Sequence, residues 1–592
     1  MPHATPKQKS SLHLHDHLTD EPVPWAPFHS RRSVVYGAKG LVACSQPLAA
    51  EAGLEILRKG GNAADAAVAV SAALNLTEPG SCGIGGDGFC LFYDAKTGDV
   101  KALNGSGRAP AALTLEKCRE LGINGSEIPF LNINAATVPG CAAVWCDTIE
   151  LLGSGKVSVA EALAPAIRMA EEGVPISEVS SHSWIKNYDT FLKQSPNFAE
   201  MLIKDPSTGK LHAPRPGEIY KNPYLAQTFR EVAEKGKAGF YEGRIAEAIV
   251  ELIQSQGGVM TLEDLKNHTT TPVTPISINY GGPEGVTLHE TPPNGQGLTA
   301  LIALGILEAI QEQGKVDLHQ TEHMSALWLH TLISAIRLAF ADTRAYIADP
   351  EHSRVPVEEL LSKDYLRKRA ELFDPTKSSP IISKGTPIAS SDTVLFEVVD
   401  QYGNGCSYIQ SNYAGFGTCA IPKGCGFTLQ NRGCNFTLEE GHPNCIAPNK
   451  RPYHTIIPAL VTRGDQKGGD LFMVYGVMGG FMQPQGHVQV LLNMLHHNLN
   501  AQATLDCPRF CISADVPGDR EKLGDIGTKV YLEDGIRPEV VEELKEMGHD
   551  VELLTGHERA MFGRGQVIQK LAGGAWAGGS DPRGDGHAVP QI

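Results

Sequence analysis

Residues 390–400 read Ser-Ser-Asp-Thr-Val-Leu-Phe-Glu-Val-Val-Asp. The preceding residues 377–391 are rich in Ser, Pro, Lys and Gly and show no apolar periodicity, whereas residues 393–400 are rich in β-branched and aromatic side chains. A turn-forming Gln-Tyr-Gly-Asn follows, and a second apolar run covers residues 406–410. This pattern predicts a linker that runs directly into a β-hairpin whose first strand begins at Thr393.

A threonine at the start of a buried strand, directly after a loose linker, is suited to self-cleavage. Its hydroxyl can attack the carbonyl carbon of Asp392, the amide shifts to an ester, and water then releases a chain that begins with Thr393. The new α-amino group, with an ordinary pKa near ~8, is a base close to neutrality and lies beside its own hydroxyl. Taken alone, an Asp-Thr step more often marks a cap or the first residue of a strand, so other parts of the chain must decide between the two interpretations.

Several glycine-rich and alanine-rich motifs elsewhere favour the first interpretation, because together they resemble the γ-glutamyltranspeptidase family. The resemblance runs in unbroken order from about Gly37 to the C-terminus, and Thr393 matches the processed nucleophile of that family. It is carried by Asn62–Ala69, Glu78–Ser81, Gly83–Phe89, Gly239–Gly243, Arg451-Pro452, Gly479-Gly480 and Ser580–Arg583.

The resemblance implies a mixed α/β (α+β) fold, the four-layer αββα sandwich of the N-terminal-nucleophile hydrolases. It also implies a proenzyme with a large subunit over residues 37–392 and a small catalytic subunit over residues 393–592. Residues 1–36 carry no apolar pattern, and we expect a disordered tail there.

Composition excludes several classes of partner. The net charge of −16 and the absence of a polybasic run argue against nucleic acid or an anionic membrane surface as a partner. No run of about 18 apolar residues is present, and the first 32 residues lack the apolar stretch of a secretory signal. Thirteen cysteines without close metal-type spacing are typical of reduced thiols, so we expect a cytoplasmic protein.

Three motifs are compatible with a cofactor or metal, but their context is unfavourable. Residues 83–88 satisfy G-x-G-x-x-G, yet a strand follows them where a dinucleotide site needs a helix. Residues 319–323 spell H-x-x-E-H, which could hold zinc on a helix, although they open an otherwise plain amphipathic helix over residues 321–347. The histidines of residues 13–17 lie in the predicted tail. We expect no cofactor and no metal.

A working amidase of this kind needs a nucleophile, a base and an oxyanion hole. Thr393 supplies the first two after processing. Gly479 and Gly480 follow an apolar strand and can direct backbone N–H groups at a developing oxyanion, although a simple tight turn is the alternative. Ser411 and Asn412 end the second hairpin strand, where they can hydrogen-bond Thr393 or the substrate, or can simply be a polar pair facing water.

The acyl pocket departs from the pattern of the glutathione-cleaving family members. Where those carry a substrate-binding Arg, this chain has Ser106, with Arg108 displaced by two positions; where they carry an Asp for the glutamyl ammonium group, it has Asn435. A serine pair is replaced within Tyr453-His454-Thr455, which places His454 and Thr455 in the pocket. Arg432 adds a planar cation suited to a carboxylate, unless it forms a surface ion pair instead.

We therefore predict a self-processing amidohydrolase or acyltransferase that cleaves γ-glutamyl amide bonds, such as those of glutathione-like compounds, through an acyl-enzyme on Thr393. A related anionic amide, such as oxamate or a glutaryl amide, is the first alternative, since the pocket need not demand a free α-amine. An unprocessed pseudoenzyme that acts as a scaffold is the second alternative. The predicted partners are the small-molecule amide and the two subunits of one precursor.

Overall fold

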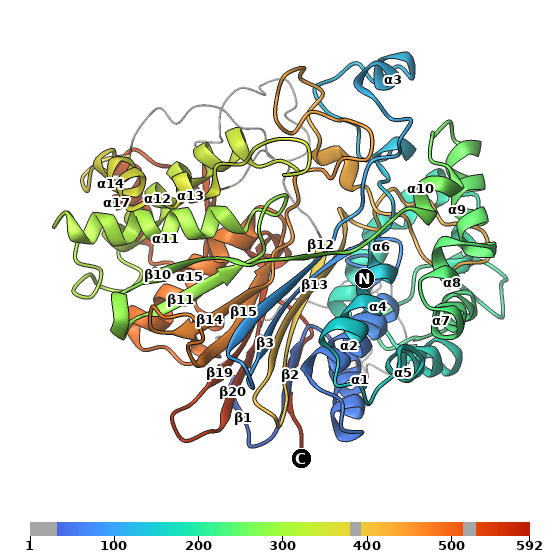
Figure 1. Ribbon diagram of the computed structural model, residues 1–592, viewed down its shortest axis with the longest axis horizontal. Helices are drawn as coiled ribbons and strands as arrows, with labels where there is room; N and C mark the ends of the chain where they lie inside the picture. The colour runs from blue at the N-terminus through green and yellow to red at the C-terminus, as the bar shows by residue number, and fades with distance from the viewer. Residues whose placement is uncertain (1–31, 379–391, 513–528) are drawn as a thin grey trace, which may run out of the picture.

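The computed structural model describes residues 32–378, 392–512 and 529–592. Two seven-stranded sheets lie face to face, and helices cover the outer face of each sheet (Figure 1). Nearly all of the predicted N-terminal tail, with its histidines, and the linker before Thr393 fall outside the described residues.

The first sheet contains the strand that begins at the candidate nucleophile. Its order is β21-β2-β12-β13-β3-β4-β9, and every neighbouring pair is antiparallel. The strands are β2 (Leu41–Cys44), β3 (Asp87–Asp94), β4 (Asp99–Gly105), β9 (Thr271–Val273), β12 (Asp392–Val399), β13 (Gly405–Tyr413) and β21 (His587–Pro590). The predicted hairpin is confirmed as β12 and β13.

The second sheet combines strands from both ends of the chain, in the order β1-β20-β19-β15-β14-β11-β10. Its strands are β1 (Val35–Gly37), β10 (Ile276–Tyr280), β11 (Val286–Glu290), β14 (Ala459–Arg463), β15 (Leu471–Met478), β19 (Arg564–Lys570) and β20 (Trp576–Ser580). The small strands β5 (Val174–Pro175), β6 (Ile203–Lys204), β7 (Leu211–His212) and β8 (Ile219–Tyr220) pair separately.

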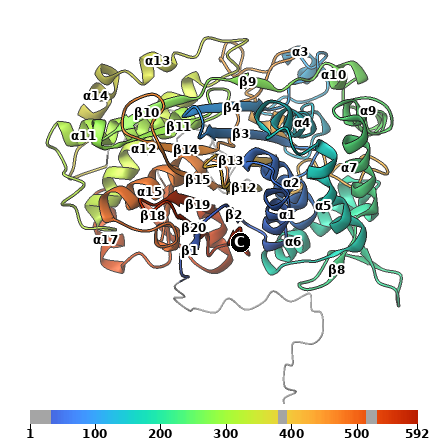
Figure 2. The same cartoon turned by 60° about the horizontal axis from the view of Figure 1, so that its bottom comes forward.

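The helices form two layers outside the sheets, and Figure 2 shows the same layers from another side. Against the first sheet pack α1 (Pro47–Arg58), α2 (Ala63–Thr77) and α4 (Cys141–Leu152), with α5 (Val159–Glu172) behind them. Against the second sheet pack α11 (Gly297–Glu312) and α15 (Met482–His497), with α12 (Ala326–Tyr346) on α11. The remaining helices are α3 (Leu115–Glu120), α6 (Glu178–Gln194), α7 (Pro223–Lys235), α8 (Ala238–Tyr241), α9 (Arg244–Ser255), α10 (Leu262–Lys266), α13 (Val357–Leu360), α14 (Lys363–Glu371), α16 (Ala503–Asp506) and α17 (Pro538–Glu546).

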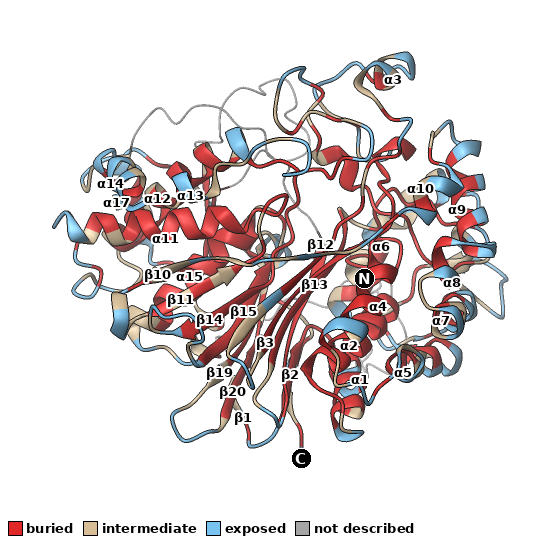
Figure 3. Cartoon of the chain, in the orientation of Figure 1, coloured by how far each residue is buried: buried red, intermediate tan, exposed pale blue. Residues whose placement is uncertain are grey.

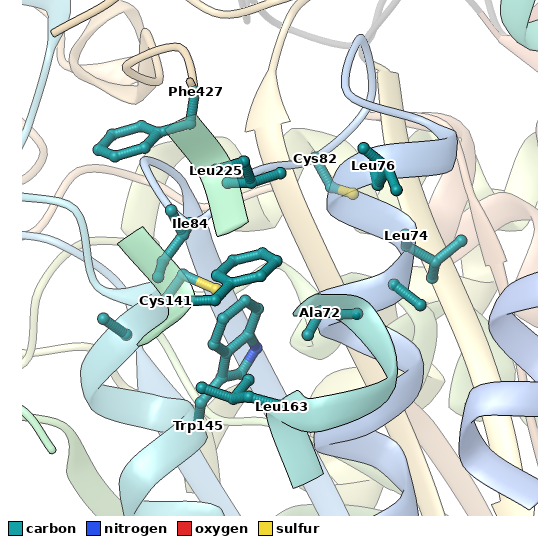
Figure 4. Packing of buried hydrophobic residues seen from close by; sticks show 14 of the residues in the cluster. Ala72, Leu74, Leu76, Cys82, Ile84, Cys141, Trp145, Leu163, Leu225 and Phe427 are labelled. Carbon is teal, nitrogen blue, oxygen red and sulfur yellow. The ribbon is translucent and has the colours of Figure 1, made fainter. Parts of the chain in front are cut away.

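Close packing of the first helical layer follows from the small residues of α2. All fifteen residues of this helix are buried, and seven of them are alanine, which lets neighbouring helices and the sheet approach closely. Asn62 caps the helix through its side chain, which accepts from the backbone N–H groups of Ala64 and Asp65. Trp145 of α4 fills the space beside α2 (Figure 4), and its indole N–H donates to Ser71 Oγ at 2.8 Å.

Apolar side chains fill all three interfaces of the sandwich. Figure 3 shows the central strands coloured mostly as buried. Between the sheets, Leu41 and Leu91 of the first sheet pack with Leu460, Val474 and Ile568 of the second. Strands buried on both faces read as continuous apolar runs, as the sequence of β15 does. The predicted four-layer αββα sandwich is confirmed.

Some predicted elements differ in their bounds. The helix expected over residues 321–347 begins at Ala326, because Ser325 caps it by accepting from the backbone of Trp328. Just beyond it, α13 and α14 are separate helices, since Ser362 caps the start of α14 by accepting from the backbone of Tyr365. A βαβ-like segment lies near the C-terminus, where β17 (Lys529–Glu533) pairs in parallel with β18 (Asp550–Leu554) across α17, and β16 (Phe510–Ile512) completes this sheet.

The carboxyl group of Glu397 lies buried between the two sheets. Ser407 Oγ donates to its Oε1 at 3.1 Å, while Oε2 has no hydrogen-bond partner within the described residues. Burial therefore raises the pKa of Glu397 well above its ordinary value. A raised folded-state pKa contributes stability that is complete below the unfolded pKa near 4.5 and is lost as pH rises toward the folded pKa.

Glu397→Gln should therefore flatten the loss of stability with rising pH. We expect the thermal unfolding midpoint of the original protein to fall as pH rises from 5 to 8, because unfolding exposes this carboxyl group and lets it ionise. The variant should lose less, and Glu358→Gln, at an exposed position on α13, serves as the control. If the unfolding midpoints of the original protein and of Glu397→Gln fell equally with rising pH, the raised pKa of Glu397 would be contradicted.

Candidate active site

Thr393 lies at an irregular point of the first sheet. The register between β12 and β13 shifts between Asp392 and Val394, so Thr393 sits at a β-bulge, and bulges of this kind are common next to active sites. Opposite the bulge, Tyr413 has a positive φ of 80°, a conformation that side chains rarely adopt. Thr393 is fully buried, and its Oγ1 donates to Ser411 Oγ at 3.1 Å. The predicted contact between Ser411 and Thr393 is present.

The glycine run before β3 packs tightly against this hairpin. A Cβ on Gly86 would lie 2.4 Å from the carbonyl oxygen of Ser411, and one on Gly85 would lie 2.3 Å from that of Thr428. The glycines thus allow close approach of backbone, and a strand follows them instead of the helix that a dinucleotide site requires. Asn412 is buried in this contact, and its Nδ2 donates to the carbonyl oxygen of Pro79 at 3.3 Å.

Gly479 and Gly480 join the end of β15 to the N-terminus of α15. Their φ values of 127° and 57° lie in the region that favours glycine. The end of β15 packs on the start of β12, because a Cβ on Gly476 would lie 2.5 Å from Leu395 Cδ1. Backbone N–H groups at the start of a 16-residue helix attract negative charge, which suits an oxyanion hole.

Gln296 ties this glycine turn to the predicted acyl pocket. Its Nε2 donates to the carbonyl oxygen of Gly480 at 2.8 Å and to that of Thr455 at 2.5 Å. Its Oε1 accepts from the hydroxyl of Tyr453 at 2.9 Å. One buried amide therefore holds the two segments in a common position.

Asp87 is a buried site residue that the sequence analysis does not predict. It stands opposite Ser411 in the register of β3 and β13, and β13 lies between it and the strand of Thr393. Its Oδ2 accepts from His454 Nε2 at 3.0 Å, where Nδ1 of the same ring faces the backbone N–H of Ile456. Its Oδ1 accepts three N–H bonds, from the backbone of Gly107 and Gly140 and from Gln430 Nε2, at 2.9, 3.1 and 2.9 Å. Asp87 therefore orients His454 and the backbone around it.

Burial acts in opposite directions on the two members of this pair. It raises the pKa of Asp87 to about 7, against the attraction of Arg432 and the donated hydrogen bonds. It holds the pKa of His454 well below its ordinary value, and the charges of Arg432 and Arg451 act in the same direction. A neutral His454 that donates from Nε2 is the form that fits its contacts.

Arg432 is the cation of the pocket. Its side chain is fully buried, with Cζ 4.3 Å from the ring centre of Tyr413, and its Nη1 donates to Thr455 Oγ1 at 2.7 Å. Nε and Nη2 are buried without a hydrogen-bond partner in the part of the chain that the structure describes. Burial lowers its pKa only to about 10, so the group is charged at neutral pH. The alternative of a surface ion pair is wrong, because no part of this side chain reaches the surface.

The other predicted pocket residues divide into two groups. Asn435 shares the short 3-10 helix η4 (Arg432–Asn435) with Arg432, and its Nδ2 is buried without a partner among the described residues. Arg108 instead turns toward Thr269 and Glu351, whose oxygens lie 3.3 and 3.5 Å from its guanidinium nitrogens. The structure thus brings His454 and Thr455 to Arg432, and Asn435 lies on the same short helix, whereas the contacts of Arg108 lie outside this network.

The zinc alternative has no support in the fold. His319 to His323 precede α12 instead of lying on it, so the spacing of four residues does not place the two imidazoles on one helical face. Over residues 32–378, 392–512 and 529–592, no group of three or more His, Cys, Asp or Glu side chains is arranged to hold a metal. Within the same ranges, no helix is both long and apolar enough to cross a membrane.

Comparison with known proteins agrees with this arrangement. The family model described as gamma-glutamyltranspeptidase matches residues 49–591. The chain belongs to the γ-glutamyltranspeptidase family. Among curated γ-glutamyltranspeptidase-like relatives, the glutathione hydrolase-like YwrD proenzyme of Bacillus subtilis is 37% identical over 94% of this chain and 99% of its own length. The oxamate amidohydrolase proenzyme of Klebsiella pneumoniae is 32% identical over 93% of this chain and 98% of its own length.

A solved structure supports the same placement within the γ-glutamyltranspeptidase family. The cephalosporin acylase from Bacillus halodurans superposes with a TM-score of 0.83 and 38% identity, over 97% of this chain and 99% of its own. The names of these three relatives differ in the substrate they state. The chain is therefore an enzyme of the γ-glutamyltranspeptidase family, made as a proenzyme.

Proposed function

We propose that the protein is a self-processing amidohydrolase that acts on amides whose acyl group carries a carboxylate. The observation that carries this proposal is the buried, charged guanidinium of Arg432, whose Nε and Nη2 have no acceptor among the described residues. Leaving buried donors of a charged group unpaired is costly, and a substrate carboxylate would pair both.

Thr393 is the proposed nucleophile. Cleavage after Asp392 frees its α-amino group, which accepts the hydroxyl proton as Oγ1 attacks the amide carbon. The backbone N–H groups of Gly479 and Gly480 stabilise the oxyanion, and collapse of the tetrahedral intermediate releases the amine. Water, activated by the same amino group, then hydrolyses the ester on Thr393. Within this scheme residues 37–392 and 393–592 are the large and small subunits.

The acyl group lies against Arg432 in this proposal. Asp87 does not compete as an ammonium partner, since four N–H donors already occupy its two oxygens. Asn435 is neutral where the glutathione-cleaving members carry an acidic residue. Dicarboxylic monoamides, of which oxamate and glutaryl amides are examples, therefore fit better than γ-glutamyl amides, which carry an additional ammonium group.

Reduced thiols throughout support a cytoplasmic location, because all thirteen cysteines are free.

Arg432→Gln tests the anion site. Loss of a charge-assisted, buried contact should lower kcat/KM for glutaryl-4-nitroanilide by about 10- to 100-fold. The loss should be much smaller for butyryl-4-nitroanilide, which lacks the carboxylate. Steady-state hydrolysis by the processed enzyme measures both, with γ-glutamyl-4-nitroanilide and oxamate assayed beside them.

Arg463→Gln is the matched control for that experiment. Arg463 also stacks on an aromatic ring, at 4.8 Å from the centre of Phe472, but it is exposed at the end of β14. Its replacement should leave every rate unchanged. Equal losses on the charged and uncharged anilides in Arg432→Gln would show that the side chain only supports the fold. Turnover confined to the γ-glutamyl compound would overturn the proposed preference.

A further inference from the structure

A second arginine with unpaired donors lies close to the glycine turn. Arg344 is in the last turn of α12, and its Nε and Nη1 are buried without a hydrogen-bond partner in the described parts of the chain. Its Cζ lies 5.3 Å from the ring centre of Phe481 and 5.9 Å from that of Phe340. Burial lowers its pKa only to about 10, so it is charged at neutral pH.

The aromatic neighbours of Arg344 belong to the candidate site. Phe481 directly follows Gly480, and its ring centre lies 5.9 Å from that of Tyr453. Tyr453 in turn precedes His454 and donates to Gln296. The guanidinium of Arg344 therefore borders the proposed oxyanion hole from the α12 side, although α12 is remote from Thr393 in sequence.

Arg344 and Arg432 occupy separate positions. Arg432 stacks on Tyr413, whereas Arg344 lies beside Phe481 and Phe340. The two side chains come from different elements, Arg432 from η4 and Arg344 from α12. Two cations held by different elements and beside different rings offer two positions at which an anion can bind.

The two arginines also differ in exposure. Arg432 is fully buried, while the side chain of Arg344 reaches solvent in part, although its Nε and Nη1 do not. In acyl transfer the acyl half of the substrate stays on the enzyme and the amine half departs to solvent. A buried cation suits the half that stays, and a partly exposed one suits the half that leaves. Glu127 attracts Arg344 through space, yet Nε and Nη1 remain without an acceptor among the described residues.

We propose that Arg344 binds a carboxylate on the amine half of the substrate, so that the preferred substrate carries one carboxylate on each side of the scissile amide. This proposal rests on the proposed function, because it uses the same acyl-enzyme on Thr393. It makes Arg344 a specificity-determining residue.

The test compares two glutaryl anilides that differ only in the leaving amine. For the processed enzyme, glutaryl-3-carboxy-4-nitroanilide should have a higher kcat/KM than glutaryl-4-nitroanilide. Arg344→Gln should lower kcat/KM for the carboxylated anilide about 10-fold, with little change for the other. Arg344→Lys, which keeps the charge, should recover part of the loss, and Arg463→Gln should change neither rate.

Binding of the free amine provides a measurement that does not need turnover. By calorimetry, 3-carboxy-4-nitroaniline should bind the processed enzyme about 10-fold more tightly than it binds Arg344→Gln, and 4-nitroaniline should bind both equally. The proposed role of Arg344 would be overturned if Arg344→Gln lost kcat/KM equally on both anilides. It would also be overturned if neither the rates nor the binding of the amine changed in this variant. If neither anilide is hydrolysed while the amine still binds through Arg344, the acyl preference fails and the Arg344 site stands.

Discussion

Replacing Thr393 with alanine should leave one uncut chain of 63.4 kDa without amidase activity. The original protein should instead separate on a denaturing gel into fragments of about 42 and about 21 kDa, apportioned by residue number, with Thr393 at the N-terminus of the smaller one. Removal of a nucleophile that acts together with its base costs on the order of 10⁶-fold in kcat in comparable hydrolases. N-terminal sequencing and hydrolysis of glutaryl-4-nitroanilide measure the two effects.

Thr393→Ser is the control for this prediction, because it keeps a hydroxyl and an α-amino group at the same position. It should still be cleaved and should keep measurable activity. An uncut original protein that hydrolyses amides at full rate would show that another group is the attacker. An uncut and inactive original protein would instead favour the scaffold alternative.

The second large effect is expected at the proposed oxyanion hole. Gly479 has φ 127°, and a Cβ there would lie 3.1 Å from Gly563 Cα, so alanine would force the backbone of the turn to move. Displaced N–H groups would no longer point at the oxyanion, and kcat should fall by about 10²- to 10³-fold. Because the same geometry serves the transition state and not the ground state, KM should change little. Single-turnover hydrolysis by the processed fraction measures the chemical step.

Gly468→Ala separates this effect from backbone strain alone. Gly468 also has a positive φ, 81°, but lies in the turn before β15, at the opposite end of the same strand, and a Cβ there would meet nothing within 4 Å. Its replacement should cost some stability and no activity. Normal kcat in Gly479→Ala would remove the glycine turn from the mechanism.

Local sequence patterns predicted those element boundaries that neighbouring residues alone determine. The start of β12 follows from a Ser-rich and Pro-rich linker that meets a run of β-branched residues, and the two glycines after β15 follow from the end of an apolar strand. The bounds of α12 were missed, because its start depends on the cap at Ser325 and not on the apolar period alone.

The candidate site depends much more on tertiary contacts. Arg432 was predicted as an anion-binding residue, but only the fold shows that it is buried over Tyr413 with two unpaired nitrogens. Arg108 was also predicted as a substrate-binding residue, but in the fold its guanidinium group pairs with Glu351. Asp87 lies within the glycine run of residues 83–88. An acidic residue between glycines was a signal that could have identified Asp87 as a site residue.

The sequence by itself determined the proposed nucleophile and the family, because a strand period, glycine positions and an ordered series of motifs are properties of neighbouring residues. The layered architecture came only through the resemblance to that family. The tertiary structure alone decided which charged groups share the site. Asp87, Arg344, Arg432 and His454 come from distant segments, and their charge and hydrogen bonding depend on burial and on partners that only the packed sandwich brings together.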